Sequence, residues 1–590
     1  MRQQHTGDAF DVVETGIRQL RIALEEGITT SEELLEAYLA RIRAYDQSGP
    51  LLNSVVELNP RARAECRASD QRRRAGSLLG PLDGIIYTAK DSYLVQGMTA
   101  AAGSPAFSQL RAQKDAFAIE RLKDAGAICL GLTNMPPMAN GGMQRGVYGR
   151  AESPYSAEYL TSAFGSGSSN GSGTATAASF AAFGLGEETW SSGRAPASNN
   201  GLAAYTPSRG IISVRGNWPL VPTMDVVVPH TRTMDDLLEV LDVLVVDDDQ
   251  TDGDLWREQE AVPLPKPSQI RPHSFTSLRI TDRAEALRRL NGVCLGAPRM
   301  YLNADPEAGT GKTVGIGGST GQRIHTRPSI LLLWEQLVTQ LKQAEVSVQL
   351  CDFPVVSRYE GDRPGVGNIR TRGLVPEDFL RAEVNELSAL SWGRFLRYNA
   401  DPELSSLTQV QGDRIFPPPP GALPDRYDGF DDDISLFPAM LRENPSLSLT
   451  DIPHLEEGLT GLEQTRQTDL EEWMDHLGLD ALLFPSAADV GPATMDVDPE
   501  AADQGWRNGV WVANGNLAIR HLGIPTVTIP LGVMSDTHMP VGVTIAGRAY
   551  DDAQLLQLAC AVEQLAPGRI PAPRTPPLSA AATTRIRGAS

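Results

Sequence analysis

Residues 161–201 read TSAFGSGSSNGSGTATAASFAAFGLGEETWSSGRAPASNNG, and the fold depends on how this stretch is interpreted. Its glycine- and serine-rich composition is typical of a flexible linker. Its middle part, TATAASFAAFGLG (174–186), instead predicts a small-residue helix that leads into a strand, which a free linker does not need. In that second interpretation, the glycines let the backbone come close to other backbone or to a substrate.

Short apolar runs alternate with helical segments on both sides of this stretch. Before it come IIYTAK (85–90), the helical AFAIERLKDAG (116–126) and AICLGLT (127–133). After it come ALLFPSA (481–487), IPTVTIPLG (524–532), MPVGVTIAG (539–547) and the helical DDAQLLQLACAVEQL (551–565). Alternation of this kind predicts an α/β fold in which helices cover both faces of a large mixed central sheet.

A single domain is expected over residues 11–565. Residues 11–44 carry apolar side chains at helical spacing, and TTSEE (29–33) is a helix-start signal. The core is expected at about 15–245 and 480–565. Residues 246–480 have weak periodicity and many prolines, so they are interpreted as an irregular middle insertion that holds the substrate-specificity region. The N-terminal and C-terminal tails are expected at 1–10 and 566–590.

Acidic side chains outnumber basic ones, 73 to 52, which gives the 590-residue chain a net charge of −21. Such a charge repels phosphate backbones and anionic lipids, so neither nucleic acid nor a membrane is expected as a partner. The five cysteines are scattered singly, which argues against a zinc site or a disulfide framework. Because neither a signal-peptide core nor an apolar run of bilayer length is present, the protein is expected to be cytoplasmic.

Two motifs in the sequence are weak candidates for other chemistry. Gly167-Ser168-Ser169-Asn170-Gly171 fits G-x-S-x-G, the nucleophile elbow with Ser169 at its centre, but the residues before it predict no strand. The segment AGTGKT (308–313) resembles a phosphate loop, but Pro306 stands where the first glycine is needed. The eight histidines share no motif, so none is singled out as the base that a serine nucleophile needs.

Lys90 is the stronger candidate base because it ends the apolar run at 85–90 and would emerge from a buried strand. Burial lowers the pKa of a lysine by up to about 3–5 units, and a neutral lysine is a competent base for serine. The alternative is an ordinary surface lysine whose stem covers apolar surface.

Five stretches in the expected order resemble the motifs of the amidase-signature family. They are GPLDGI (80–85) followed by Lys90-Asp91, DAGA to TNM (124–135), SGSSNGS (166–172), GEETWSSGRAP (186–196), and GIP to IPLG to MPVG (523–542). The fourth resembles the family pattern G-T-[DE]-T-x-G-S-x-R-x-P. Because several linked motifs agree, the resemblance is more specific than any one of them, and it covers about 15–245 and 480–565.

The resemblance implies a role for each matched residue. Ser192 would be the nucleophile, Ser168 the bridging serine held by a cis peptide bond, and Lys90 the base. Three backbone N–H groups, those of Thr189, Trp190 and Ser191, would form the oxyanion hole together with that of Ser192. Three further residues would support the site: Ser169, Glu188 and Arg194.

The sequence departs from the family at Trp190 and Ser191, where glycines are usual. If the loop requires a positive φ, a tryptophan there is strained. In the other interpretation, the backbone is kept and the Trp190 side chain narrows or shapes the pocket. Glu188 stands in place of the commoner aspartate, and it would pair with Arg194 to brace the loop.

The implied activity is amide-bond hydrolysis of a small molecule through an acyl-enzyme, with neither a metal nor an organic cofactor. Esters and carbamates are alternative substrates of the same site, and a homodimer is compatible with the resemblance. Two other functions stay open: a non-catalytic binding or scaffold protein, and the amidotransferase subunit that acts on glutamyl-tRNA with partner subunits. Two aromatic stretches, around Trp392–Tyr398 and Trp506–Trp511, belong either to an apolar pocket or to the core.

Overall fold

The computed structural model describes residues 10–311, 323–426, 433–508 and 513–578, and within them eleven strands form one sheet. In sheet order the strands are β1 (Val55–Leu58), β3 (Ile128–Thr133), β2 (Ile86–Lys90), β4 (Phe183–Glu188), β6 (Val226–Thr231), β5 (Ala203–Thr206), β10 (Thr526–Val533), β11 (Pro540–Ala546), β9 (Ala481–Pro485), β7 (Cys294–Pro298) and β8 (Ser347–Cys351). β2 runs parallel to β3 and β4, and β7 runs parallel to β8 and β9. The other neighbours are antiparallel. The predicted α/β class with a large mixed sheet is confirmed.

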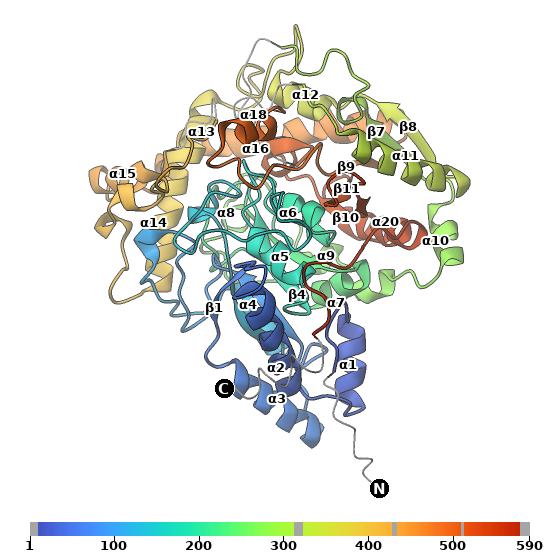
Figure 1. Ribbon diagram of the computed structural model, residues 1–590. Coiled ribbons are helices and arrows are strands. Elements are labelled where there is room, and N and C mark those ends of the chain that lie inside the picture. Colours follow the sequence, from blue (N-terminus) through green and yellow to red (C-terminus); the bar gives the residue numbers. More distant parts are fainter. Residues whose placement is uncertain (1–9, 312–322, 427–432, 509–512, 579–590) are drawn as a thin grey trace.

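Helices surround this sheet on all sides of the view in Figure 1. They are α1 (Ile17–Glu25), α2 (Ser31–Arg41), α3 (Ala62–Ala75), α4 (Phe117–Asp124), α5 (Asn170–Ala177), α6 (Arg194–Asn199), α7 (Met234–Leu244), α8 (Leu255–Glu258), α9 (Pro267–Ile270), α10 (Arg283–Leu290), α11 (Pro328–Gln343), α12 (Pro354–Glu360), α13 (Glu377–Ala382), α14 (Ser388–Asn399), α15 (Phe437–Glu443), α16 (Leu455–Arg466), α17 (Glu472–Leu477), α18 (Pro499–Gly505), α19 (Asn516–His521) and α20 (Asp552–Leu565).

The side-chain alternation of β6 shows how helices cover both faces of the sheet. Val227 belongs to the apolar cluster that includes side chains of α7 and α20. Its neighbours Val226 and Val228 belong to a different cluster, with alanines of α5 and α6. Because successive side chains of a strand point to opposite faces, α7 and α20 lie on one face and α5 and α6 on the other. The active-site candidates come from the α5 and α6 side.

The glycine- and serine-rich stretch at 161–201 is packed core, and the linker interpretation is wrong. Nearly every residue of this stretch is buried. It forms α5 and then β4, as its middle part predicts. A Cβ on Gly171 would lie 2.3 Å from the backbone nitrogen of Asn134, so glycine is required there by close backbone approach.

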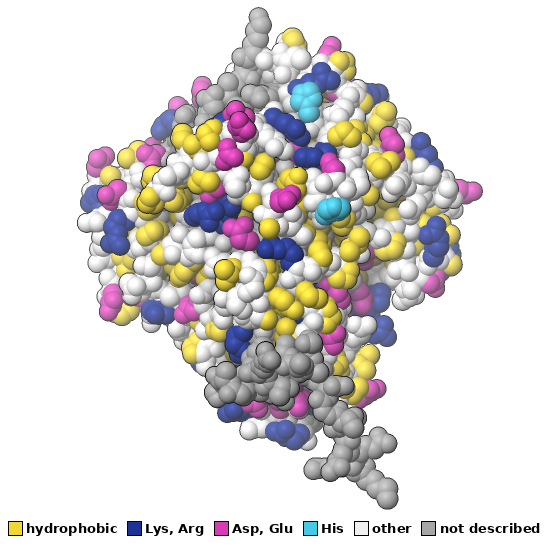
Figure 2. All heavy atoms as spheres, viewed as in Figure 1, with side chains coloured by type: hydrophobic (Ala, Val, Ile, Leu, Met, Phe, Trp, Pro, Cys, Tyr) yellow, Lys and Arg dark blue, Asp and Glu magenta, His cyan; other side chains and the backbone are white. Residues whose placement is uncertain are grey.

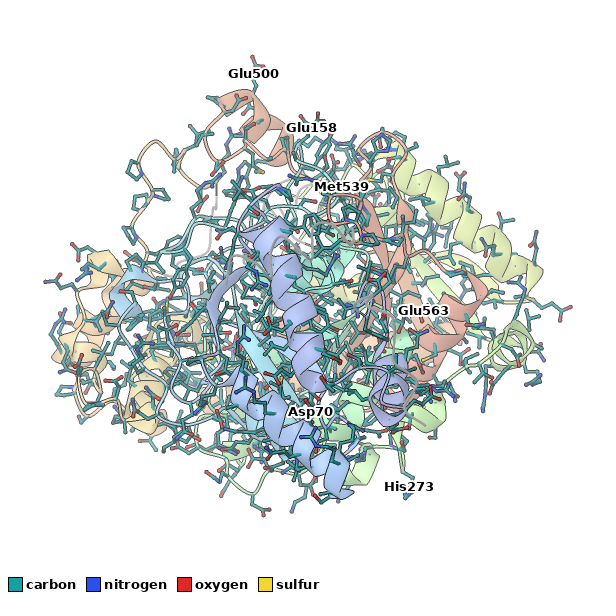
Figure 3. The ribbon with its side chains drawn as sticks, turned by 60° about the horizontal axis from the view of Figure 1, so that its bottom comes forward. Asp70, Glu158, His273, Glu500, Met539 and Glu563 are labelled. Atoms are coloured by element: carbon teal, nitrogen blue, oxygen red, sulfur yellow. The ribbon has the colours of Figure 1, made fainter. Side chains whose placement is uncertain are left out.

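The second N-terminal helix, α2, begins where the sequence predicts. Thr30 caps α2, accepting the Glu33 backbone N–H at 3.1 Å while the Glu33 carboxylate accepts the Thr30 backbone N–H at 3.0 Å. Asp70 of α3, labelled in Figure 3, accepts the Ser31 backbone N–H at 2.8 Å. Both carboxylates satisfy N–H groups at the start of the helix, and Asp70 also fixes α2 against α3.

The middle of the chain differs from the expectation of an insertion added to a finished core. β7 and β8 lie within residues 246–480 and extend the sheet beyond β9. α11 packs against β8, and the two lie side by side at the upper right of Figure 1, while α13, α14 and α15 lie at the left. The strands escape prediction because they are only five residues long and because CLGAP is interrupted by glycine and proline. The predicted domain boundaries stay a prediction.

The predicted C-terminal tail is packed as far as residue 578. Ala572 and Thr575 are buried. The Arg41 side chain donates to the carbonyl oxygens of Thr575 and Ala178, both at 2.7 Å, and thereby ties this segment to the end of α5. These contacts are made to carbonyl oxygens, which carry no sequence signal, and the boundary of the tail stays a prediction.

Charges of both signs are interspersed over the face of the molecule that Figure 2 shows. In the described part of the chain, no helix combines the length and apolar character that crossing a bilayer requires. No group of three metal-ligating side chains is found among the described residues either.

Candidate active site

Three segments of the core bring Lys90, Ser168 and Ser192 together. Lys90 is the last residue of β2, Ser168 lies two residues before α5, and Ser192 lies in the turn between β4 and α6. Because β2 and β4 are parallel neighbours, their carboxyl ends lie at the same edge of the sheet. Lys90 and Ser168 are completely buried, and Ser192 is 2% exposed.

Hydrogen bonds connect the three residues through Ser168. The Lys90 Nζ donates to Ser168 Oγ at 2.7 Å. The Ser168 backbone N–H donates to Ser192 Oγ at 3.0 Å. Ser168 therefore contacts the amine of Lys90 with its side chain and the hydroxyl of Ser192 with its backbone.

Burial holds the pKa of Lys90 below its ordinary value, because the surroundings disfavour the ammonium form. Three carboxylates oppose this effect: those of Glu187, Asp225 and Glu188. Glu187 is the first of them, with Oε2 at 3.6 Å from Lys90 Nζ.

Glu187 is held by two further side chains. Ser92 Oγ donates to Glu187 Oε2, and Asn217 Nδ2 donates to Glu187 Oε1. Ser92 lies two positions after Lys90, the last residue of β2. The carboxylate is therefore fixed in front of the lysine by donors from two separate segments.

The expectation of a cis peptide bond at Ser168 is wrong for this structure. The described residues contain no cis peptide bond. A trans backbone already brings the Ser168 N–H to Ser192 Oγ at 3.0 Å.

The segment expected to form the oxyanion hole is partly engaged in internal hydrogen bonds. The Ser191 N–H donates to Ser166 Oγ at 3.1 Å, and Ser166 Oγ lies 3.5 Å from Ser192 Oγ. The Ser191 hydroxyl donates to the Ser166 carbonyl at 2.6 Å. The Thr189 hydroxyl donates to Asp225, whose pKa burial raises to about 7. An oxyanion bound by the Ser191 N–H has to displace the Ser166 hydroxyl.

Trp190 adopts no positive φ, so the tryptophan does not strain this loop. Its indole Nε1 donates to Asn516 Oδ1 at 3.1 Å. The Asn516 Nδ2 in turn donates to Glu360 Oε1 at 2.8 Å. The side chain is 8% exposed and connects the loop to α19 and α12. Whether it also shapes a pocket stays a prediction.

Glu188 and Arg194 form a fully buried ion pair, with Glu188 Oε1 at 2.8 Å from Arg194 Nε. Glu188 Oε2 also accepts the backbone N–H groups of Gly193 and Arg194, at 2.9 and 2.8 Å. Arg194 donates further to the carbonyls of Trp190 and Asn514, at 2.7 and 2.6 Å. The pair fixes both ends of the turn that carries Ser192.

The structure gives the two alternative nucleophile arrangements no support. Ser169 Oγ donates to the Glu187 carbonyl and accepts the Glu187 backbone N–H, each at 3.0 Å, so this hydroxyl is held against β4. His230 is bonded to Ser172 Oγ at 3.0 Å and to the Gly193 carbonyl at 2.9 Å. Burial lowers the pKa of His230 to about 4, so its ring is neutral near pH 7.

The two aromatic stretches have different surroundings. Trp392 is buried in a ring cluster with Phe107 and Trp218, and so belongs to the core. Trp506 packs edge to face on Phe164, two residues before Ser166. Trp511 lies outside the described residues, as does Lys312 of the phosphate-loop segment.

Sequence reasoning missed Glu187, Ser166 and Asn516. The signal for Glu187 was available, because two neighbouring glutamates at the end of a strand must point to opposite faces. Ser166 stands at a glycine position of the family motif, which is a weaker signal. Asn516 is more than 300 positions from the loop that it contacts, and no local pattern indicates such a contact.

Comparison with known proteins gives a consistent result. The family model "Amidase" matches residues 33–276. A glutamyl-tRNA(Gln) amidotransferase subunit of Salinibacter ruber is 26% identical over 92% of this chain and 98% of its own length. The corresponding protein of Cupriavidus metallidurans is 33% identical over 50% of this chain, and the match spans 57% of that relative.

Among solved structures, the native peptide amidase of Stenotrophomonas maltophilia is 25% identical, with a TM-score of 0.69 over 95% of this chain and 98% of that one. A 6-aminohexanoate cyclic dimer hydrolase complexed with substrate has the same fold, with a TM-score of 0.63 at 19% identity. The family model matches residues 33–276, the motifs stand in the family's order, and the fold is shared along nearly the whole described chain, so this protein is similar to the amidase-signature family.

Proposed function

We propose that this protein hydrolyses a carbon–nitrogen amide bond of a small molecule, with Ser192 as nucleophile, Ser168 as bridging residue and Lys90 as base. The observation that carries the proposal is the buried contact of Lys90 Nζ with Ser168 Oγ at 2.7 Å, next to the Ser192 hydroxyl. A serine becomes nucleophilic only when a base removes its proton, and a desolvated lysine can do so.

The mechanism moves one proton along this chain of residues. Neutral Lys90 takes the proton of Ser168, Ser168 takes that of Ser192, and Ser192 Oγ attacks the carbonyl carbon. The Thr189, Trp190 and Ser191 N–H groups stabilise the oxyanion, the last after Ser166 has been displaced. Collapse of the tetrahedral intermediate breaks the C–N bond, and the same residues return the proton to the leaving amine. Water then hydrolyses the acyl-enzyme. Esters and carbamates are alternative substrates because the acyl-enzyme chemistry is the same.

Labelling with a fluorophosphonate probe, followed by peptide mapping, tests this proposal. We expect the wild type to be labelled on Ser192, Ser192→Ala to lose the label, and Ser168→Ala and Lys90→Ala to be labelled at least a hundredfold more slowly. Ser277→Ala, which changes an exposed serine far from these residues in sequence, is the control and should be labelled like the wild type. Absence of label from the wild type would favour a non-catalytic scaffold. Label on Ser169 would favour the nucleophile-elbow interpretation of residues 167–171.

A second candidate function is that of an amidotransferase subunit, because the Salinibacter ruber relative aligns over 92% of this chain. That function needs partner subunits and a tRNA. Affinity purification from the native source distinguishes the two. A purified chain that hydrolyses amides alone supports the first proposal, and stable co-purifying subunits support the second.

A further inference from the structure

The base of the proposed mechanism shares its buried site with a carboxylate that the mechanism does not use. Glu187 Oε2 lies 3.6 Å from Lys90 Nζ. Glu187 and Glu188 are neighbours on β4, so their side chains point to opposite faces. Glu188 is bound by Arg194 and two backbone N–H groups, whereas Glu187 is bonded by two neutral side chains, those of Ser92 and Asn217. When Lys90 is protonated, its ammonium group is the cation next to this carboxylate.

Besides Glu187, the charged groups that act most strongly on Lys90 are Glu188 and Asp225, and burial raises the pKa of Asp91, the next residue in the chain, to about 8. Glu188 lies on β4 beside Glu187, and Asp225 lies just before β6. His230 of β6 feels the charge of Lys90, and its ring is neutral near pH 7. Glu188 is neutralised by Arg194, and Asp225 accepts the Thr189 hydroxyl. Glu187 is therefore the carboxylate nearest to Lys90 that has no other cation as partner among the described residues.

We propose that Glu187 is a positioning residue that holds Lys90 in its ammonium form at low pH and so sets the acid limb of the pH–rate profile of Ser192. This inference rests on the proposed function, because it concerns the base of that site. Only the neutral amine accepts a proton, so acylation requires Lys90 to have lost its proton first. The Glu187 carboxylate opposes that loss, and Ser92 and Asn217 keep the carboxylate in place.

The direction of the effect follows from electrostatics. An opposite charge within about 4–6 Å favours the charged form of a group by 1–3 pKa units. Removing the carboxylate therefore makes Lys90 neutral at a lower pH, and the reaction starts at a lower pH. A residue with a purely structural role would change the maximal rate but would leave the midpoint of the acid limb in place.

Glu187→Gln tests this inference, since glutamine keeps the shape and removes the charge. The measurement is the rate of fluorophosphonate labelling on Ser192 between pH 5 and pH 10. We expect the acid-limb midpoint of the variant to lie about 1–3 pH units below that of the wild type. Glu187→Asp keeps the charge, so its midpoint should stay within about half a unit of the wild type while its maximal rate falls. Glu120→Gln, which removes a carboxylate that pairs with Arg215, is the matched control and should change neither quantity.

The outcomes separate the two proposals. Wild-type labelling on Ser192 with an unshifted midpoint in Glu187→Gln would overturn the inference and leave the proposed function standing. If the wild type is not labelled at any pH, both the proposed function and the inference about Glu187 are wrong. If Glu187→Gln is not recovered folded, as judged by circular dichroism, Glu187→Thr replaces it, because the family pattern carries threonine there. The same downward shift is expected of that variant, and an unshifted midpoint would overturn the inference equally.

Discussion

Glu187 and Glu188 are neighbours on strand β4, but their carboxylates lie on opposite faces and have different partners. Glu188 is completely buried, and its two oxygens accept three N–H donors of a single turn. Glu187 has two neutral donors and, at 3.6 Å, the amine of Lys90. On one side the carboxylate fixes a backbone, whereas on the other it lies beside the amine of the proposed base. Burial and residue type alone therefore do not assign a role, and the partner of the carboxylate does.

The largest expected effect comes from breaking the Glu188 side. Arg194→Met leaves Glu188 buried without a cation, and removal of one partner of a buried pair costs about 3–5 kcal/mol. Denaturant unfolding measures this free energy. The control is Arg121→Met, which breaks an exposed pair with Asp124 and should cost at most about 1 kcal/mol. Equal losses in the two variants would contradict the structural role of Glu188.

Asp91, next to Lys90, is a third buried carboxylate to compare with Glu187 and Glu188. It is held by a backbone donor and not by a cation. Its Oδ2 accepts the Gly103 N–H at 2.9 Å, and no hydrogen-bond partner for Oδ1 lies in the described part of the chain. Burial raises the pKa of Asp91 to about 8. The folded state therefore keeps a proton that the unfolded state loses near pH 4, and stability falls as the pH rises from about 4 to 8.

Asp91→Asn removes this titration. Between pH 5 and pH 8 we expect the unfolding free energy of the wild type to fall relative to that of the variant by about 3 kcal/mol. Denaturant unfolding at several pH values checks this difference. Parallel pH dependence of the two proteins would show that Asp91 is ionised in the folded state.

A smaller effect is expected where the loop after Glu188 contacts α19. Trp190→Phe removes the indole donor to Asn516 Oδ1 and should cost about 1–2 kcal/mol of unfolding free energy, because a buried acceptor is left unsatisfied. The labelling rate of Ser192 should fall several-fold as the loop loosens. Trp334→Phe on α11 is the control for labelling, and an equal loss of rate there would contradict a local effect.

The smallest expected effect concerns Ser166. Ser166→Ala frees the Ser191 N–H, and a neutral hydrogen bond contributes about 0.5–1.5 kcal/mol. If the Ser191 N–H binds the oxyanion, labelling of Ser192 should become up to about tenfold faster. An unchanged rate would show that the Ser191 N–H does not bind the oxyanion. That role would then belong to the N–H groups of Thr189, Trp190 and Ser192.

The features that the sequence predicted well are local elements of secondary structure and one contact between residues of two family motifs. The strand ending at Lys90, the Thr30 cap and the helix leading into β4 follow from spacing and composition, and all are found. The contact of Lys90 with Ser168 follows from the family resemblance, and these two groups lie 2.7 Å apart.

What the sequence did not predict depends on contacts between distant segments. β7 and β8 are too short and too irregular to be recognised alone, and they become strands because β9 offers an edge. The partners of Glu187 come from residues 92 and 217, and those of Arg194 from residues 514 and 516. No periodicity within one element encodes such pairs.

The hydrogen bonds from Arg194 to the carbonyls of Asn514 and Asn516 cannot form until the ribosome has synthesised those two residues. Asn516 follows Arg194 by 322 positions. At about 5–20 residues per second, roughly 20–60 s pass between the two on the ribosome. During this interval the nascent chain carries Lys90, Ser168 and Ser192 without the segment that fixes the turn around Ser192. The complete arrangement around Ser192 thus forms only after Asn516 has been synthesised, and a chain that ends before this residue lacks it.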